Sequence, residues 1–149
     1  MRDVGKNKGF TLIELIVIIV IVGIVALIAA PRFFTQSTFD AARFHEAAIS
    51  AIRYAQKVAV AQRANVFVVT SATTLALCYD AGCATSVANP GGSDNFVLNI
   101  PAGIAITVAS FNFNSLGQPA PNVLTTLSIS GDAAPRQIVV ERETGYVHK

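Results

Sequence analysis

Residues 8–30, "KGFTLIELIVIIVIVGIVALIAA", decide the architecture of this chain. Residues 10–30 are apolar with three exceptions, Thr11, Glu14 and Gly23. A helix of 21 residues is about 31 Å long, which matches the roughly 30 Å hydrocarbon core of a bilayer. A secretory signal peptide has a shorter apolar region, and a glutamate near its start is foreign to that pattern. The stretch therefore predicts a single membrane-spanning helix over residues 10–30.

The charges before this helix predict its orientation. Residues 1–9 contain three basic residues, Arg2, Lys6 and Lys8, and one acidic residue, Asp3. Their net charge of +2 equals the formal net charge of the whole chain. The positive-inside rule then places the N-terminus in the cytoplasm and exports the rest. Because the remainder is neutral, bulk charge does not favour nucleic-acid binding, and copies can pack without long-range repulsion.

Glu14 is the only charged residue at membrane depth. Insertion scales give an acidic residue at the centre of a membrane helix a cost of roughly 3 kcal/mol. Ionisable residues in such positions are functional by default, and a partner charge is the first expectation. The alternative for a single chain is a glutamate that lies at the level of the lipid headgroups.

The segment Lys8-Gly9-Phe10-Thr11-Leu12-Ile13-Glu14 resembles the processing site of type IV prepilins and of the pseudopilins of type II secretion. The resemblance implies that a prepilin peptidase cuts after Gly9, removes residues 1–9 as a leader and methylates Phe10. It also implies a partner for Glu14, because the freed Phe10 amine of one subunit can meet the Glu14 carboxylate of another. At 4 Å this pair is worth about 4 kcal/mol at an effective dielectric near 20, although desolvation offsets much of it.

Helical periodicity resumes after Pro31. Apolar residues recur at spacings of three, four or seven on one face, namely Ala41, Ala48, Ile52, Ala55 and Ala59. The pattern predicts that the helix continues over residues 31–64 as an exported segment. Small alanine side chains on this face permit close approach to a packing partner.

Gly23 and Pro31 predict a soft part of the helix. Glycine costs roughly 1 kcal/mol relative to alanine inside a helix, and Pro31 cannot donate a hydrogen bond to the helical ladder. In lipid the helix should persist, since unpaired backbone groups there are costly. We expect a continuous helix in the monomer and a non-helical stretch between Gly23 and Pro31 after assembly, as the family resemblance also implies.

From residue 65 onward the pattern predicts strands. Short runs rich in β-branched and aromatic residues alternate with Gly- and Pro-rich turns, and the expected strands are 66–70, 75–79, 95–100, 104–113, 123–130, 136–142 and 145–148. Residues 65–149 should form an antiparallel β-sheet domain that buries the exported half of the helix. The predicted fold class is α+β and type IV pilin-like.

Cys78 and Cys83 are the only cysteines. Two thiolates without nearby histidines do not make a metal site, so no metal is predicted. Export into an oxidising compartment favours a disulfide between them, worth about 2 kcal/mol for so small a loop. Two free buried thiols are the alternative.

No catalytic motif is present. The sequence lacks the G-x-S-x-G, H-E-x-x-H and P-loop patterns, and its two histidines, His45 and His148, lie at opposite ends of the exported part. We therefore expect a structural protein without catalytic residues or a cofactor.

Two further resemblances refine the expected role. Residues 111–119 (FNFNSLGQP) and 136–149 (RQIVVERETGYVHK) resemble the C-terminal pattern of H-type pseudopilins. Residues 30–34 (APRFF) and 52–63 (IRYAQKVAVAQR) resemble minor pilins of the mannose-sensitive haemagglutinin pilus type. DNA-uptake relatives have a basic cluster near the C-terminus. In this chain Glu141 and Glu143 offset Arg136 and Arg142. DNA capture is therefore the least favoured of the expected functions.

These resemblances imply a minor pilin that starts or caps a type IV pilus. An H-type minor pseudopilin of type II secretion is the alternative, and a DNA-binding tip pilin is the third. Expected partners are other pilin or pseudopilin subunits, the prepilin peptidase and methyltransferase, and the pilus assembly machinery. The expected location is the bacterial inner membrane, with the C-terminal domain in the periplasm, followed by the pilus or pseudopilus.

Overall fold

The computed structural model describes residues 10–92, 95–131 and 134–149, without the side chains of residues 27–37. The predicted leader, residues 1–9, lies outside the described residues. One helix, α1 (Leu12–Gln62, 51 residues), precedes all the strands. The chain divides into two compact units between Gln36 and Ser37, and α1 contributes to both.

The C-terminal half of α1 buries the face that the periodicity predicts. Ala41, Ala48, Ile52, Ala55 and Ala59 are each at most 1% exposed. Larger apolar side chains, Phe44, Ile49 and Val58, fill the same core beside the alanines. The charged side chains of Arg43, Arg53 and Lys57 lie on the exposed face, as an amphipathic helix requires.

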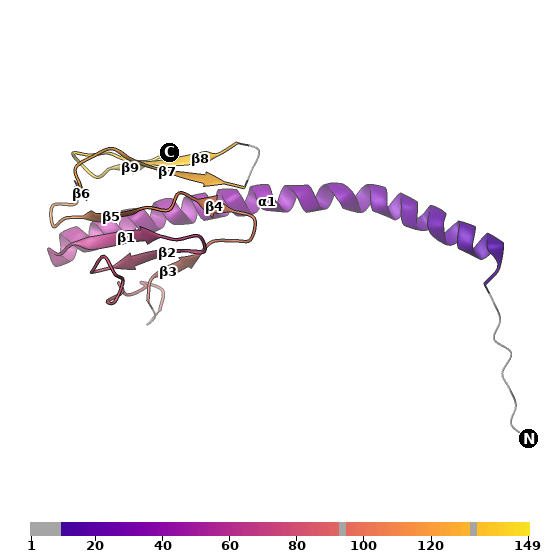
Figure 1. The fold of residues 1–149 in the computed structure, drawn as a ribbon, viewed down its shortest axis with the longest axis horizontal. Coiled ribbons are helices and arrows are strands. Elements are labelled where there is room, and N and C mark those ends of the chain that lie inside the picture. The colour runs from indigo at the N-terminus through magenta and orange to yellow at the C-terminus, as the bar shows by residue number, and fades with distance from the viewer. Residues whose placement is uncertain (1–9, 93–94, 132–133) are drawn as a thin grey trace, which may run out of the picture. The chain divides into compact units, whose positions relative to one another are not determined.

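The strands that follow form two antiparallel sheets (Figure 1). The first sheet has the order β3-β2-β1-β5-β6, with β1 (Val66–Thr70), β2 (Thr74–Cys78), β3 (Val97–Asn99), β5 (Ser110–Phe113) and β6 (Pro119–Ala120). The second has the order β4-β7-β8-β9, with β4 (Ala105–Ile106), β7 (Thr125–Ser130), β8 (Arg136–Val140) and β9 (Val147–His148). The predicted antiparallel domain is confirmed.

Both sheets share one core with α1. Side chains alternate between buried and more exposed along the strands, and the buried ones face the helix. The core includes Val66 and Val68 from β1, Phe113 from β5, Leu127 from β7 and Ile138 from β8. In Figure 1 the C-terminal half of α1 runs along the two sheets. The α+β architecture expected from the sequence is therefore present.

The prediction of one strand over residues 104–113 is wrong. This segment contains β4, which belongs to the second sheet, and β5, which belongs to the first. Thr107 remains with the second sheet, because its amide donates to the carbonyl of Ser128. At Ala109 the chain has reached the end of β1, where its amide donates to the Thr70 hydroxyl at 2.7 Å.

Thr70 occupies the point where the chain crosses between the sheets. Its hydroxyl lies 2.8 Å from the carbonyl oxygen of Thr107 and 3.1 Å from that of Ala109, and it donates toward both. The side chain is 3% exposed, so these bonds satisfy a polar group inside the core. A second difference lies between the strands expected at residues 104–113 and 123–130, where no strand was predicted and the structure has the short edge strand β6.

Candidate functional site

The predicted processing and assembly residues surround the start of α1. Thr11 precedes the first helical residue, and its hydroxyl accepts a hydrogen bond from the Glu14 amide at 3.3 Å. Its carbonyl accepts the Leu15 amide at 3.2 Å, as the first bond of the helix. Thr11 is therefore the N-cap, and Thr-x-x-Glu matches the capping-box pattern.

Glu14 lies in the first turn of α1, where the positive end of the helix dipole stabilises a carboxylate. Within the described part of the chain its side chain makes no ion pair. Phe10 lies outside the helix and is 73% exposed. The predicted contact between Glu14 and a Phe10 amine involves two subunits and stays a prediction, as does cleavage at Gly9, which lies outside the described residues.

The turns that follow present apolar side chains on all sides. The large apolar residues between Leu12 and Val25 are 43–77% exposed. Contiguous apolar surface of this kind marks a site of interaction with protein or lipid.

Within the described residues, no helix combines the length and the apolar character that a membrane span requires.

Gly23 and Pro31 both lie inside α1, which is helical throughout. A Cβ added to Gly23 would meet no atom within 4 Å, so no contact in this chain requires a glycine there. The side chain of Pro31 is outside the described set. The expected softening of this segment after assembly stays a prediction.

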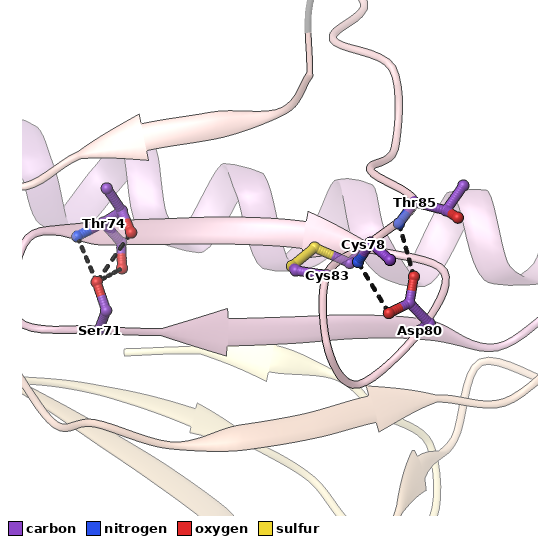
Figure 2. Close-up of a disulfide and its surroundings, with 7 residues drawn as sticks. Ser71, Thr74, Cys78, Asp80, Cys83 and Thr85 are labelled. Atoms are coloured by element: carbon purple, nitrogen blue, oxygen red, sulfur yellow. Dashed lines mark hydrogen bonds between the residues drawn. A yellow bond between two sulfur atoms is a disulfide. The ribbon is translucent and has the colours of Figure 1, made fainter.

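The structure pairs Cys78 with Cys83, as the export argument favoured over free thiols (Figure 2). Asp80 lies between the two cysteines, and its side chain binds the backbone just after Cys83. Its carboxylate accepts the amides of Ala84 at 2.9 Å and Thr85 at 2.7 Å. These backbone hydrogen bonds, with that of Ala84 the largest cause, lower the pKa of Asp80.

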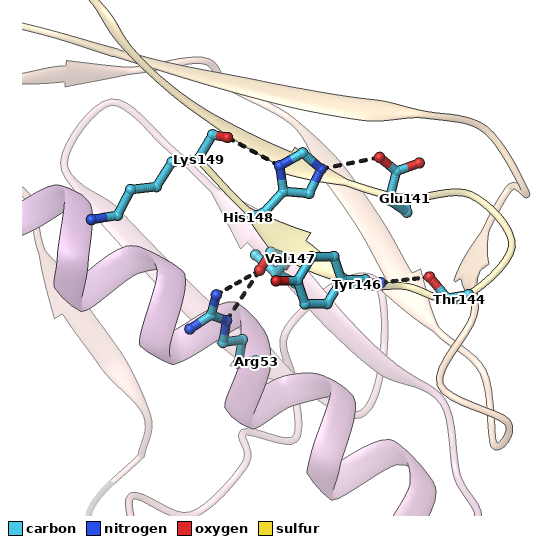
Figure 3. A network of polar contacts seen from close by, with 7 residues as sticks. All are labelled: Arg53, Glu141, Thr144, Tyr146, Val147, His148 and Lys149. Carbon is cyan, nitrogen blue, oxygen red and sulfur yellow. Dashed lines mark hydrogen bonds and ion pairs between the residues drawn. The ribbon is translucent and has the colours of Figure 1, made fainter.

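A second polar cluster joins the end of the chain to α1 (Figure 3). Arg53 donates from Nε and Nη2 to the Val147 carbonyl oxygen, at 3.1 and 2.7 Å. The Lys149 ammonium pairs with Glu46 at 2.6 Å, also on the helix. The last strand is therefore attached to α1 on both sides of His148.

His148 is held by acceptors on both ring nitrogens. Its Nε2 lies 3.0 Å from the Glu141 carboxylate, and its Nδ1 lies 3.0 Å from the Lys149 carbonyl oxygen. The hydrogen bond to Glu141 is the main reason that the pKa of His148 is raised, and the bond to Lys149 adds to it. Tyr146 stacks on the same ring, with centroids 5.5 Å apart.

His45 has a separate structural contact. It is 4% exposed, and its Nε2 lies 2.9 Å from the carbonyl oxygen of Gln137 in β8, so it links helix and sheet. Its Nδ1 lies 3.6 Å from the Glu46 carboxylate, the same group that binds Lys149. Glu46 on α1 thus contacts both its neighbour His45 and Lys149 at the other end of the sequence. The described residues contain no group of three or more His, Cys, Asp or Glu suited to a metal ion.

Sequence reasoning missed three residues that organise this structure. Thr11 had a visible signal, the Thr-x-x-Glu spacing. Arg53 had none, because its acceptor is 94 residues away. Gln56 had none either, and its amide donates to the carbonyl oxygens of Gly117 and Thr144, both at 2.9 Å. Gln56 therefore links the turn between β5 and β6 of the first sheet to the turn between β8 and β9 of the second.

Comparison with known proteins agrees with this geometry. Residues 5–30 match a family model described as the prokaryotic N-terminal methylation motif. Two crystal structures of the Pseudomonas aeruginosa type IV minor pilin FimU resemble the chain. One has 19% identity over 69% of this chain and 86% of that chain, with a TM-score of 0.51. The other has 15% identity over 81% and 90%, with a TM-score of 0.52.

The comparison with curated proteins gives no significant match. At such low identity, the likeness to FimU concerns the fold alone. The chain therefore combines an N-terminal methylation motif with a type IV pilin fold, in which an N-terminal helix packs on an antiparallel β-sheet domain.

Proposed function

We propose that this chain is a structural pilin-like subunit, not an enzyme, which a prepilin peptidase cuts between Gly9 and Phe10. One observation carries the proposal: a methylation motif over residues 5–30 leads directly into a chain with the type IV pilin fold. In this reading, cleavage and methylation leave a mature chain that begins with a cationic Phe10 amine. Residues 10–30 anchor the subunit in the inner membrane, and the domain from residue 65 onward lies in the periplasm.

Assembly in this proposal depends on apolar surface and on one charge pair. The exposed apolar turns of α1 supply area for contact with the helices of neighbouring subunits. Such contacts are non-directional and do not select one axial position. The Phe10 amine of one subunit and the Glu14 carboxylate of another would fix the axial position of an incoming subunit. Neither charge is stable alone among apolar side chains, so the position that pairs them is favoured.

The favoured role is a minor pilin that helps to start or cap a type IV pilus. This choice rests on the segments at residues 30–34 and 52–63 that resemble minor pilins of the mannose-sensitive haemagglutinin type. An H-type minor pseudopilin of type II secretion is the second candidate, favoured by the patterns at residues 111–119 and 136–149. Other pilin or pseudopilin subunits and the assembly machinery are the proposed partners.

DNA capture at a fibre tip is the third candidate. Two of the basic residues near the C-terminus are matched by carboxylates, since His148 meets Glu141 at 3.0 Å and Arg142 meets Glu143 at 3.4 Å. Duplex DNA binding relies on unpaired basic side chains that displace counterions from phosphates. The pairing observed here does not favour that use.

Intact-mass measurement of the protein from membranes and from sheared fibres tests the proposal. The expected species begins at Phe10 and carries one added methyl group. A protein that keeps residues 1–9 in every fraction, in cells with an active prepilin peptidase, would overturn it. Deletion of the gene then separates the two leading candidates: loss of fibres indicates a pilus, and loss of secreted proteins with intact fibres indicates a secretion system.

A further inference from the structure

We propose that Asp80 is a positioning residue for closing the Cys78–Cys83 disulfide, because its carboxylate holds the loop between them in the shape that brings the two sulfur atoms together. The inference goes beyond the proposed function and does not depend on it, since it concerns how the β-sheet domain becomes oxidised. The oxidant belongs to the class of disulfides, small-molecule or protein, that exchange with thiols in an oxidising compartment.

The chain around the disulfide is a short hairpin whose backbone is paired on both sides of a loop (Figure 2). Cys78, the last residue of β2, forms an antiparallel bridge with Ser86. The Tyr79 amide donates to the Thr85 carbonyl oxygen at 2.8 Å. The loop that remains, residues 80–84, decides where the second cysteine lies.

Asp80 binds the far side of that loop through both its side chain and its backbone. Its Oδ1 accepts the Ala84 amide at 2.9 Å, and its Oδ2 accepts the Thr85 amide at 2.7 Å. Its carbonyl oxygen accepts the Cys83 amide at 3.1 Å. Three successive amides therefore bind one residue. The backbone around Cys83 is fixed by hydrogen bonds that need no bond between sulfur atoms.

Cys83 needs such support, because its backbone is left-handed. Its φ is +56°, in a region that residues with a Cβ rarely adopt. Gly82, just before it, widens the choice of open loop conformations. Without the carboxylate, a reduced loop would leave the left-handed conformation more often. The apparent equilibrium constant for closure falls in proportion to the fraction of reduced chains whose loop is closed.

Closure takes two exchange steps. Cys78 is 0% exposed and Cys83 is only partly buried, so the Cys83 thiolate is the one that attacks the oxidant. This step forms a mixed disulfide and releases one thiolate. Cys78 then loses its proton, and its sulfur attacks the Cys83 sulfur, which breaks the mixed disulfide and releases a second thiolate. The released thiolates take up the two cysteine protons, so two thiols are oxidised and one disulfide is reduced. The second step needs the closed loop, and it is the step that Asp80 favours.

The test uses the full-length chain in detergent micelles, first reduced and then equilibrated with mixtures of glutathione and glutathione disulfide at one pH. Acid quenching and intact mass give the fractions of reduced chain, closed chain and chain that carries one glutathione. We expect Asp80→Ala to lower the equilibrium constant for closure about tenfold, the low end for a charge-assisted hydrogen bond because the loop is exposed. The glutathione adduct should accumulate in this variant. Asp80→Asn keeps one acceptor oxygen and should lie between Asp80→Ala and the wild type.

Ser71→Ala is the matched control. The Ser71 hydroxyl accepts the amides of Thr73 and Thr74, at 3.2 and 2.9 Å, so it caps the turn at the other end of β2 (Figure 2). The variant loses a similar contact between a side chain and a turn but leaves the loop between the cysteines intact. Its equilibrium constant for closure should equal that of the wild type.

Amide hydrogen exchange reads the loop without an oxidant. In the reduced wild-type chain the amides of Ala84 and Thr85 should stay protected. Asp80→Ala should speed their exchange about tenfold, because the carboxylate that accepts them is gone. Ser71→Ala should leave both rates unchanged.

Three results would overturn the inference. Equal equilibrium constants in Asp80→Ala and the wild type would show that the carboxylate does not assist closure. An equal fall in Asp80→Ala and Ser71→Ala would show a general loosening of β2. Fast exchange of both amides in the reduced wild-type chain would show that the loop stays open until the sulfur atoms bond. If Asp80→Ala does not fold, Asp80→Asn carries the same comparison, and a wild-type constant in that variant contradicts the inference.

Discussion

Arg53 of α1 and Val147 of β9 are joined by two hydrogen bonds to a single carbonyl oxygen, although 94 residues separate them. β9 contains only two residues and pairs with β8 alone. Val147 is 1% exposed, so its side chain also packs in the core. The guanidinium and this apolar contact together fix the end of the chain on the helix (Figure 3).

Removing that guanidinium should destabilise the domain. Arg53→Ala is expected to lower the free energy of unfolding by about 1.5–3 kcal/mol, the usual contribution of a charge-assisted hydrogen bond. Arg53→Lys should recover only part of it, since an ammonium does not reproduce the paired donors. Lys57→Ala, one turn later on the exposed face, is the matched control and should change stability by less than about 0.5 kcal/mol. Urea denaturation of the full chain in detergent measures all three, and equal values for Ala at both positions would contradict this assignment.

Gly9→Ala should block processing. The proposed cut follows this glycine, and an added methyl group beside the bond should obstruct the peptidase. The variant should accumulate in the membrane with residues 1–9 attached, as seen by intact mass. Its mature form, beginning at Phe10, would refute the assignment of the cleavage site.

Glu14 variants can separate charge pairing from helix capping. Glu14→Gln keeps a side chain suited to the third helical position of a capping box but removes the charge, whereas Glu14→Ala removes both. We expect both to insert into the membrane and both to enter fibres poorly, because the Phe10 amine of the neighbour loses its partner. The amount of this subunit in sheared fibres, relative to its total amount, is the measurement. Normal incorporation of Glu14→Gln would show that the charge is not used.

The segment from Gly23 to Pro31 is helical in this chain and should lose helical hydrogen bonds in an assembled fibre. A Cβ added to Gly23 would meet no atom within 4 Å, so no contact in this chain requires a glycine there. Neighbouring helices can replace lipid around it, so unwinding becomes less costly than in a bilayer. A fibre reconstruction that resolves this subunit checks the expectation. Unbroken helical bonding from Gly23 through Pro31 in such a map would exclude it.

His148 should make stability depend on pH above its ordinary titration range. The hydrogen bond to Glu141 raises the pKa of His148 in the folded state. Its contribution is therefore complete below the unfolded pKa of about 6.5 and is lost as the pH rises through the folded value. His148→Gln and Glu141→Gln should both flatten this part of the profile in urea denaturation. An unchanged slope between pH 6 and about 8 in either variant would show that the pair does not contribute.

The sequence predicted those features that depend on local pattern. The alanine face of α1 follows from helical spacing, and β1, β7 and β8 follow from runs of β-branched residues between turns. The cap at Thr11 is equally local, and the Thr-x-x-Glu spacing is its signal, but the same Glu14 is also a charge at membrane depth, which favours a different role for it. The pairing of Cys78 with Cys83 followed from chemistry and compartment.

The remaining features depend on contacts between distant residues. The break between β4 and β5 exists because Thr70, at the end of β1, satisfies the backbone at Ala109. Nothing within residues 104–113 marks that point. β6 begins with Pro119 and reads as a turn, and it is a strand only because β5 lies beside it. Arg53 carried no local sign that it would bind a carbonyl of the last strand.

The interleaved order of the strands limits how this domain can be exchanged between homologues. β4 precedes β5 and β6 in the chain, yet it pairs with β7 of the other sheet. In a chimera of two homologues, a junction anywhere between β1 and β5 builds the first sheet from strands of both parents. A junction between β4 and β9 does the same to the second sheet. Although there are two sheets, the chain offers no breakpoint between them. Only a crossover before Val66 delivers both sheets from one parent, so the region from β1 to β9 should be inherited as a single block.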